Sequence, residues 1–418
     1  MGGGSGWVLL TYSPRDKRLV NAWAADHTAT LAGGTPILAI DMYELAYEMD
    51  FSEGGELRRH VHEGDPLAER GPAPRPVAQD VAVPGRCAGT MLAAALATTL
   101  FAVSPGGRAA EGGPLVLERT ITLANVSGRI DHMAVDLARG RLFVAELGNG
   151  SVDVVDLARG NVIHRFTGLK DPQGVGYTPA ADILAVASAG DGTVRLFTGK
   201  DFLPGPVVPL GDDADNVRVD PASGHLLVGY GGGGLAVIDP LSGAVLSRVL
   251  LAAHPEGFQI EPLSRRAFVN IPDDRQIAVV DLVAGRQVAS WRMPGSRSNF
   301  PMAVDTSGKT VASVFRSPPR LLLLDAATGS IRQSLGTCGD ADDVFFDEGR
   351  GRIYVTCGSG SIDTFRAADG IYRKSGATTT GSGARTSLFV AELDRLFVAQ
   401  RAGLLGSTAA ILVFRPAD

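Results

Sequence analysis

The sequence from residue 129 to residue 169 is the unit from which most of the chain is built. It holds four short runs in which apolar residues occupy alternate positions, separated by turn-forming clusters such as Gly148–Gly150 and Ala158–Gly160. Such alternation is typical of β-strands, so the unit predicts a four-stranded antiparallel meander. A sheet with apolar side chains on both faces needs a further sheet on each side, so the unit requires neighbouring copies of itself.

Copies of the unit follow one another to the end of the chain. The carboxylates that end its first and third runs recur, and adjacent copies lie 41 to 44 residues apart. The first set is Asp136, Asp220, Glu261, Asp305 and Asp347, and the second is Asp156, Asp239, Asp281 and Asp325. This period is that of a β-propeller blade, so we predict an all-β propeller in preference to an ordinary β-sandwich.

Seven blades account for residues 115–418. The units begin near Ile130, Gln173, Asn216, Gly257, Pro301, Asp343 and Ser387. Leu115–Leu123 stands alone before the first full unit, and the last unit has only three runs, the third being Ala410–Phe414. We therefore expect Leu115–Leu123 to pair with Ala410–Phe414 and to close the ring.

Composition and cysteine spacing limit the classes of partner. The 418 residues carry a net charge of −6 with no cluster of Lys and Arg, which argues against a nucleic-acid partner. The three cysteines form no CxxC motif, which excludes zinc-finger and c-type haem sites. Cys338 and Cys357 fall at the same end of one blade, where they either form a disulfide in an exported protein or lie buried and reduced in a cytosolic one.

Residues 1–62 do not share the repeat. Residues 6–12, 18–23 and 35–41 read as three strands, and residues 42–47 as the start of a helix. The stretches GSGWVLLTYSP and TPILAIDMYELAY resemble the C-terminal domain of the iron/manganese superoxide dismutases, whose signature D-x-W-E-H-A-Y contains two metal ligands. The resemblance implies a small α+β remnant of that domain at residues 1–62.

The metal site that this resemblance implies is incomplete in the sequence. Asp41 matches the ligand Asp and Glu44 the signature Glu, but the second ligand position holds Leu45, which has no lone pair. The family's other two His ligands come from a helical domain that we do not find in the chain. We therefore expect no dismutase activity, and iron or manganese only if another chain completes the site.

Two further segments separate this remnant from the propeller. Residues 63–87 form a Pro-rich linker. In residues 88–111, which follow Arg86, 16 apolar or small residues precede a helix-breaking stretch; this pattern is typical of a secretory signal peptide and is short for a membrane span. The alternative is a buried Ala-rich helix. We predict a signal-like hydrophobic helix, no stable membrane span, and a propeller that begins near Glu111 in the periplasm or outside the cell. Residues 1–85 then come from a gene fusion or from a start site placed too far upstream.

Three strand motifs identify a second resemblance, over residues 115–418. Arg141–Ala145, Arg352–Cys357 and Arg395–Ala399 are each followed by a turn and an apolar run. They resemble the YVTN-type (YncE-like) seven-bladed propellers of bacterial envelopes. This resemblance implies the fold and an exported location, but no reaction, because the motif residues are strand and turn positions.

The loops before the first strands of the blades are the candidate site, because these loops open on one end of the central channel. Polar residues stand at this position in every blade, and we predict ligand binding by Asp131, His132, Gln173, Asn216, Glu256, Asn299, Asp343 and Arg385. The alternative is that these loops are polar only because loops lie at the surface.

Three mechanisms can use such a ring of side chains. Clustered carboxylates suit Ca²⁺ or Mg²⁺. His132 and Glu256 can act as acid and base in a lactonase-type hydrolysis, since some seven-bladed propellers are lactonases. The ring can also be a docking surface for a small ligand or a protein. We expect this third, non-enzymatic role, because no GxSxG nucleophile motif with a partner histidine is visible.

Overall fold

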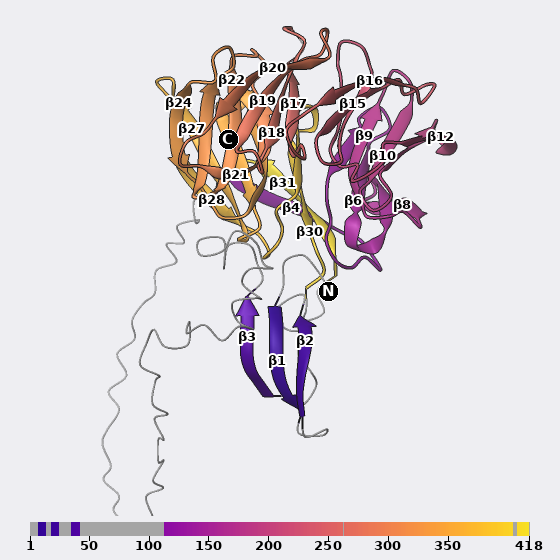
Figure 1. Ribbon diagram of the computed structural model, residues 1–418, viewed down its shortest axis with the longest axis vertical. Coiled ribbons are helices and arrows are strands. Elements are labelled where there is room, and N and C mark those ends of the chain that lie inside the picture. Colours follow the sequence, from indigo (N-terminus) through magenta and orange to yellow (C-terminus); the bar gives the residue numbers. More distant parts are fainter. Residues whose placement is uncertain are drawn as a thin grey trace, which may run out of the picture. The chain divides into compact units, whose positions relative to one another are not determined.

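The computed structural model describes residues 7–13, 18–24, 35–41, 113–261, 263–403 and 408–417. The chain divides into two compact units, residues 1–105 and residues 106–418, and each is described by itself. The regular elements of the described residues are strands, joined by three single 3-10 turns at Leu147–Asn149, Glu348–Arg350 and Ala391–Leu393 (Figure 1). None of the described segments is a helix of the length and apolarity needed to cross a bilayer.

The first unit contains a three-stranded antiparallel sheet. Its central strand β1 (Trp7–Ser13) pairs with β2 (Arg18–Ala24) on one side and with β3 (Thr35–Asp41) on the other. The three strands predicted for this segment are therefore confirmed. The predicted helix at residues 42–47, the Pro-rich linker and the signal-like helix at residues 88–111 lie outside the described residues.

The second unit consists of seven four-stranded antiparallel sheets, and the prediction of seven blades is confirmed. Blades 1 and 2 are β5 (Met133–Asp136), β6 (Arg141–Glu146), β7 (Ser151–Asp156), β8 (Asn161–Thr167) and β9 (Pro172–Thr178), β10 (Ile183–Ser188), β11 (Thr193–Thr198), β12 (Leu203–Pro209). Blades 3 and 4 are β13 (Val217–Val219), β14 (Leu226–Tyr230), β15 (Gly234–Ile238), β16 (Val245–Leu250) and β17 (Phe258–Glu261), β18 (Arg266–Ile271), β19 (Gln276–Asp281), β20 (Arg286–Arg292). Blades 5 and 6 are β21 (Arg297–Val304), β22 (Thr310–Ser317), β23 (Pro319–Asp325), β24 (Ile331–Gly336) and β25 (Ala341–Asp347), β26 (Arg352–Cys357), β27 (Ser361–Ala368), β28 (Ile371–Thr379). Blade 7 is β29 (Ser387–Val390), β30 (Arg395–Gln400), β31 (Ala410–Pro416) and β4 (Leu115–Thr122).

Blade 7 combines the two ends of the propeller segment. Strand β4 pairs antiparallel with β31, with Ile121 opposite Ile411, so the purple β4 lies beside the yellow β31 (Figure 1). Glu118 of β4 adds ion pairs to Arg395, at 2.6 Å, and to Arg415, at 3.0 Å. The predicted closure of the ring by the leading strand is confirmed.

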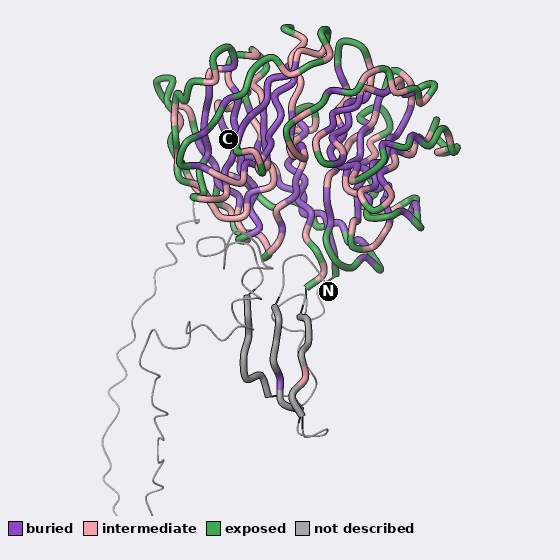
Figure 2. Tube along the Cα trace, viewed as in Figure 1, coloured by how far each residue is buried: buried purple, intermediate pink, exposed green. Residues whose placement is uncertain are grey.

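Apolar side chains fill the seam between each pair of neighbouring blades. In β10, Leu184 and Val186 pack against blade 1, whereas Ile183 and Ala185 pack against blade 3. Successive side chains of a strand point to opposite faces, so a strand between two seams is apolar at nearly every position. Figure 2 shows the result as buried strands with exposed connections at the margins.

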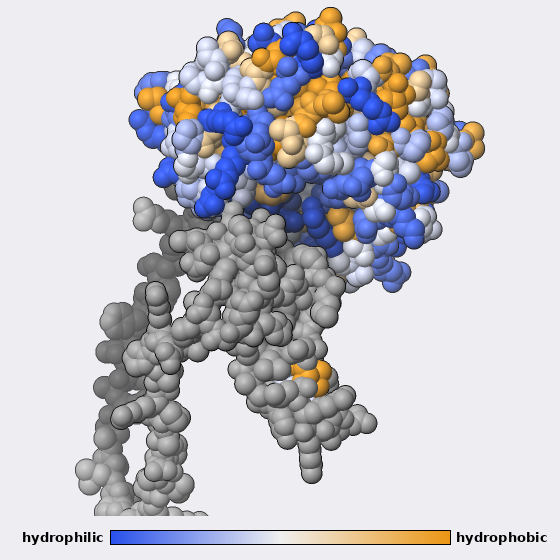
Figure 3. All heavy atoms as spheres, viewed as in Figure 1, coloured by the Kyte–Doolittle hydropathy of each residue, from blue (hydrophilic) through white to orange (hydrophobic). Residues whose placement is uncertain are grey.

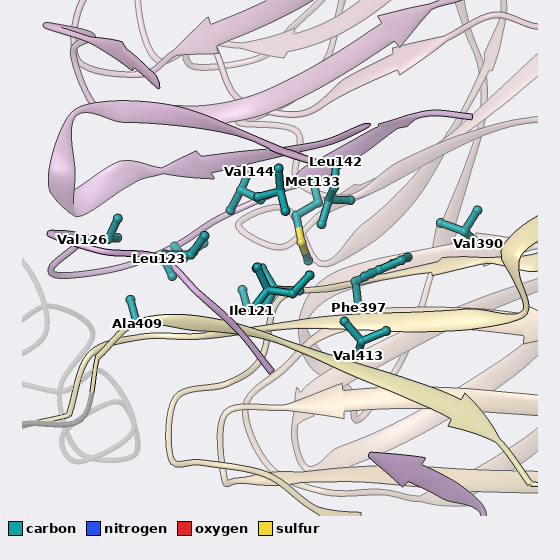
Figure 4. Packing of buried hydrophobic residues seen from close by; sticks show 14 residues of the cluster. Ile121, Leu123, Val126, Met133, Leu142, Val144, Val390, Phe397, Ala409 and Val413 are labelled. Carbon is teal, nitrogen blue, oxygen red and sulfur yellow. The ribbon is translucent and has the colours of Figure 1, made fainter. Parts of the chain in front are cut away.

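The seam between blades 7 and 1 is built in the same way, although its strands come from opposite ends of the segment. Ile121 and Leu123 meet Met133 and Leu142 of blade 1, with Phe397 of β30 beside them (Figure 4). Closure therefore buries a full hydrophobic seam as well as forming a strand pair.

The fourth strands of the blades form the rim, and each of them carries at least one exposed apolar side chain. Leu203 and Val207 of β12 and Leu246 and Leu250 of β16 are exposed. Figure 3 shows apolar patches among polar groups on the propeller surface in view. Single exposed apolar residues are ordinary on a protein surface.

Blade 6 contains the disulfide between Cys338 and Cys357, with a Cα–Cα distance of 5.9 Å. Cys357 is the last residue of β26, and Cys338 precedes β25. The disulfide alternative for these cysteines is therefore the one found in the structure.

Candidate functional site

The first strands of the seven blades surround the channel. Each of β5, β9, β13, β17, β21, β25 and β29 contacts the first strand of the next blade, and β29 contacts β5. Because all seven sheets have the same order and direction, the segments that lead into the first strands lie at one end of the channel. The turns between first and second strands lie at the other end.

The carboxylates at that other end are saturated by their own turns. The Asp136 carboxylate accepts the Arg139 N–H at 3.1 Å, and the Glu261 carboxylate accepts the Leu263 N–H at 2.9 Å. Asp325, which ends a third strand, accepts hydrogen bonds from the Arg332 guanidinium, the Thr328 hydroxyl and the backbone N–H groups of Ala327 and Thr328. These bonds, that of Arg332 first, lower the pKa of Asp325 to about 2. The recurring acidic residues of the sequence are therefore turn caps.

The leading end of the channel holds a different arrangement, which begins with an arginine arc on blades 5, 6, 7 and 1. The arc consists of Arg316, Arg385 and Arg129 with the carboxylates of Asp342, Asp340 and Asp131. Arg316 and Arg385 both bind Asp342, at 2.5 and 2.8 Å, and Arg129 lies 2.7 Å from Asp131. Arg316 also stacks on the Phe300 ring at 3.8 Å.

The carboxylates of the arginine arc are thus matched by guanidinium groups. Burial acts to raise the pKa of Asp342, but Arg385, Arg316 and Arg129 outweigh it and hold that pKa below its usual value. Asp340 lies within ion-pair distance of Arg385, at 2.9 Å, and of Arg316, at 3.4 Å. The arc is therefore close to neutral and internally paired.

A histidine arc occupies blades 1, 3 and 4. It consists of His132, Asp213, Asp215, Asn216, His254 and Glu256. The Asp215 carboxylate lies between two imidazoles, with one oxygen 3.9 Å from His132 Nε2 and the other 3.8 Å from His254 Nε2. His254 Nδ1 is 2.7 Å from the Gly231 carbonyl oxygen, so this ring nitrogen donates and holds the imidazole in place.

Burial and mutual repulsion shift the pKa values in the histidine arc. Burial raises the pKa of Glu256 to about 8, and the nearby Asp215 charge adds to the shift. For His254, burial acts to lower the pKa, but the Asp215 carboxylate and the Gly231 carbonyl overcome it and raise the pKa to about 9. At neutral pH His254 is therefore charged and Glu256 is largely neutral.

Two buried acceptors of the histidine arc have no hydrogen-bond donor. Asp215 is 5% exposed and Asn216 is 2% exposed, and the Oδ1 atom of each is buried without a hydrogen-bond partner. Asp131 Oδ2 is also without a well-directed hydrogen bond, but this oxygen forms an ion pair with Arg129. Buried oxygens without donors are costly, so Asp215 and Asn216 mark the place in the cluster that is chemically incomplete.

Glycine lets the blades approach closely enough to form this cluster. A Cβ on Gly174 of blade 2 would lie 2.0 Å from the Asp215 carbonyl oxygen, and a Cβ on Gly257 would lie 2.3 Å from the Phe300 carbonyl oxygen. The backbone leading into β13 therefore rests directly on blade 2, which fixes the position of Asp215.

The predicted site residues fall into two groups. Asp131, His132, Glu256, Asp343 and Arg385 lie in one electrostatically coupled cluster, and Asn216 has a buried Oδ1 atom without a hydrogen-bond partner. Burial raises the pKa of Asp343 well above its usual value, and Asp343 accepts the Ser387 N–H at 2.6 Å.

The other two predicted residues have structural contacts. Gln173 provides its backbone carbonyl, which accepts the His132 N–H at 3.2 Å. Asn299 is fully buried inside β21, where its amide donates to Asn270 at 2.9 Å and to the Gln276 carbonyl at 3.0 Å. It lies inside the strand because β21 begins at Arg297, before the predicted position.

Several cluster residues were missed by the sequence prediction. Arg129 and His254 each stand two residues before a predicted site residue, Asp131 or Glu256, and side chains two apart on extended backbone point the same way. Asp213 and Asp340 stand in the same way before Asp215 and Asp342, the neighbours of the predicted Asn216 and Asp343. That spacing is a signal that was present in the sequence. Arg316 comes from the end of β22, and nothing in the sequence pattern brings it to the channel.

Metal ligands do not gather at the channel or elsewhere in the described part of the chain. It holds no group of three or more His, Cys, Asp or Glu side chains placed to bind a metal ion. Asp41, the predicted remnant of an iron or manganese site, is the last residue of β3, and Leu45 lies outside the described residues. Because the second ligand position is a leucine, the residues of this segment do not fit the metal.

Comparison with known proteins separates the two units. Residues 2–56 match the family model described as iron/manganese superoxide dismutases, C-terminal domain. A superoxide dismutase [Fe] of Cupriavidus metallidurans is 76% identical over 51 residues, which are 12% of this chain and 26% of that protein. The chain thus spans about a quarter of the length of this curated relative.

Solved structures resemble the propeller at low sequence identity. A chain of Kuenenia stuttgartiensis hydrazine synthase has a TM-score of 0.60 at 15% identity, covering 70% of this chain and 98% of its own length. A chain of a mitotic checkpoint complex has a TM-score of 0.64 at 12% identity, covering 78% of this chain and 99% of its own length. At these identities the likeness shows the fold alone: the chain joins a segment similar to a superoxide dismutase C-terminal domain to a seven-bladed β-propeller.

Proposed function

We propose that the propeller is a non-enzymatic binding module that takes a small ligand or a segment of a protein partner at the leading end of its channel. The observation that carries this proposal is the contrast between the two ends. At one end the recurring carboxylates are saturated by turn N–H groups, whereas at the other the buried oxygens of Asp215 and Asn216 have no donor. A ligand that donates hydrogen bonds to these oxygens would remove the free-energy cost of burying them without a partner.

A ligand screen on the full chain tests this function. Thermal unfolding is measured against a library of sugars, amines, carboxylates, short peptides, Ca²⁺ and Mg²⁺, with the Asp215→Asn/Glu256→Gln double variant as the comparator. A ligand present at 100 times its Kd stabilises the native state by about 3 kcal/mol. Stabilisation that is lost in the double variant supports the proposal. No hit, or hits that stabilise both proteins equally, would refute it.

The propeller is proposed to belong with the YVTN-type (YncE-like) proteins and to work outside the cytoplasm. The motifs Arg141–Ala145, Arg352–Cys357 and Arg395–Ala399 form the second strands β6, β26 and β30, as a repeated strand motif should. The Cys338–Cys357 disulfide favours an oxidising compartment. N-terminal sequencing of the exported protein tests this: we expect a mature terminus near Glu111, and a cytosolic full-length chain with free thiols would contradict it.

A lactonase-type hydrolysis is the second candidate, and one observation favours it. His132 Nε2 faces the carboxylates of both Asp131, at 3.7 Å, and Asp215, at 3.9 Å, which is how carboxylates orient a general base. Glu256, the proposed partner acid, is coupled to the same Asp215. Turnover of a lactone panel that is abolished by His132→Ala would establish this function and reject the binding-only proposal.

For the N-terminal segment we propose no independent dismutase activity. The residues matched to the dismutase domain offer Asp41 but carry Leu45 at the second ligand position. Metal analysis and a dismutase assay on the purified full chain test this. A stoichiometric iron or manganese ion bound to the chain would refute it.

A further inference from the structure

The histidine arc has a composition that selects among ligand classes. Its carboxylates, Asp213, Asp215 and Glu256, face the imidazoles of His132 and His254. The arginines of the arginine arc are paired with their own carboxylates, and the buried Arg218 of β13 is shared between Asp215 and Asp343. Counted together with Arg218 and Asp343, four carboxyl groups face three basic side chains, so acidic groups outnumber basic ones around Asp215. A ligand that fits has a positive charge and does not add another acceptor.

The unpartnered atoms point to the same chemistry. Asp215 Oδ1 and Asn216 Oδ1 are acceptors, and both are buried. An ammonium group carries three donors and no acceptor. A carboxylate or phosphate would instead be repelled by Asp215, and a hydroxyl would bring lone pairs while leaving the excess of acidic groups unchanged.

We propose that the ligand of the channel end is a small aliphatic primary amine whose ammonium group binds at Asp215, between His132 and His254. This inference rests on the proposed binding function and names its ligand class. The Asp215 carboxylate is the acceptor of the ammonium group. The arginine arc stays paired with its own carboxylates and closes the opposite side of the channel.

Binding of a cation at this place has a consequence that binding of a neutral molecule lacks. The charged and titratable groups that face the site come from blades 1, 3, 4, 5 and 6. They are Arg129, Asp131, His132, Asp213, Asp215, Arg218, His254, Glu256, Arg316, Asp342 and Asp343. A new positive charge lowers the pKa values of Glu256, from about 8, and of His254, from about 9. Amine binding near pH 7.5 should therefore release protons.

The experiment uses three four-carbon probes whose end groups are cationic, neutral or anionic: 1,4-diaminobutane, 1,4-butanediol and butanedioate. Each is titrated into the full chain by calorimetry at pH 7.5, in phosphate and in HEPES, because the difference between the two heats counts the protons released. We expect diaminobutane to bind with proton release and the other two probes not to bind. Asp215→Asn should weaken diaminobutane binding roughly 10- to 100-fold, and Glu256→Gln should reduce the proton release.

Asp281→Asn is the matched control. Asp281 caps a turn at the other end of blade 4 through N–H groups of Val283 and Ala284, far from the histidine arc, so diaminobutane affinity should not change. Equal or better binding of the diol or the diacid would overturn the amine assignment, as would diaminobutane binding that Asp215→Asn leaves intact or the absence of binding by all three probes. The wider library screen then separates the two claims, because another ligand class that depends on Asp215 would retain the binding function.

Discussion

Replacing Glu256 by glutamine should change the pH dependence of the propeller's stability. Glu256 has its pKa raised from 4.5 to about 8 in the native state, chiefly by burial and secondly by Asp215. Between those values the native state keeps a proton that the unfolded chain has lost. The free energy of unfolding therefore falls as pH rises from about 4.5 to about 8.

The size of this effect follows from the shift. Each pKa unit corresponds to about 1.4 kcal/mol, so the full shift sets a ceiling of about 5 kcal/mol above pH 8. Part of the pKa shift reflects the coupling of Glu256 to His254 and Asp215. We therefore expect the free energies of unfolding of Glu256→Gln and the wild type to differ by about 2 to 5 kcal/mol above pH 8. Glutamine has the shape of the protonated acid, so Glu256→Gln should match the wild type at pH 4.5 and exceed it at pH 9.

Differential scanning calorimetry of both proteins at pH 4.5, 6, 7.5 and 9 measures this difference. The tryptophan signal is less suitable, because Trp7 and Trp23 lie outside the propeller and only Trp291 lies within it. His254 adds to the same trend in both proteins, because its raised pKa of about 9 stabilises the native state below about pH 6.5 and is lost as pH rises through 9. A difference between the two proteins that is constant with pH, or larger at pH 4.5, would refute the reasoning.

Three further changes probe the framework of the site. Gly174→Ala should unfold the propeller at lower temperature and weaken ligand binding, because its Cβ would meet the Asp215 carbonyl at 2.0 Å. Ile121→Ala, at a fully buried position of the closing strand β4, should cost about 2 to 5 kcal/mol in denaturant unfolding, whereas Leu117→Ala, at a half-exposed position of the same strand, should cost much less. Replacing both Cys338 and Cys357 by alanine should cost about 3 kcal/mol, since the bond closes a loop with a sequence separation of 19.

Each of these changes has a result that would contradict it. A Cβ on Gly339 would have no heavy atom within 4 Å, so Gly339→Ala should be harmless, and equal effects at Gly174 and Gly339 would remove the argument from close approach. Equal costs at Ile121 and Leu117 would mean that the closing seam contributes little. An unchanged unfolding midpoint in the cysteine double variant would show that the disulfide does not stabilise blade 6.

The blades were predictable from the sequence because each is a local meander. The alternation from Arg141 to Asp156 and the turn carboxylates specify the strands within a blade, and the period specifies how many blades follow. The closing pair of β4 and β31 was also predictable, since one extra run stood before the first unit and the last unit lacked one run. These features depend on residues that are neighbours in sequence or occupy equivalent positions.

The site was only partly predictable because it is assembled from different blades. Asp215 is incomplete only because His132 and His254 approach it from blades 1 and 4 without donating a good hydrogen bond, and the repeat pattern contains no such distances. Asn299 differs in that its amide N–H groups are taken by Asn270 and the Gln276 carbonyl, although its Oδ1 atom is also buried without a partner. Polarity at the channel end was thus a reliable guide to position, but not to which groups remain available.

The pairing of β4 with β31 also governs when this protein can finish folding. Strand β4, which completes blade 7, is synthesised first among the propeller strands, and its partner β31 is synthesised last. The ring can therefore close only after nearly all of the propeller residues have been synthesised. During that time the exposed edge of β4 and the seam residue Ile121 are available to other chains. A chain broken off before Ala410 would keep that edge permanently, which makes truncated copies targets for proteolysis or aggregation.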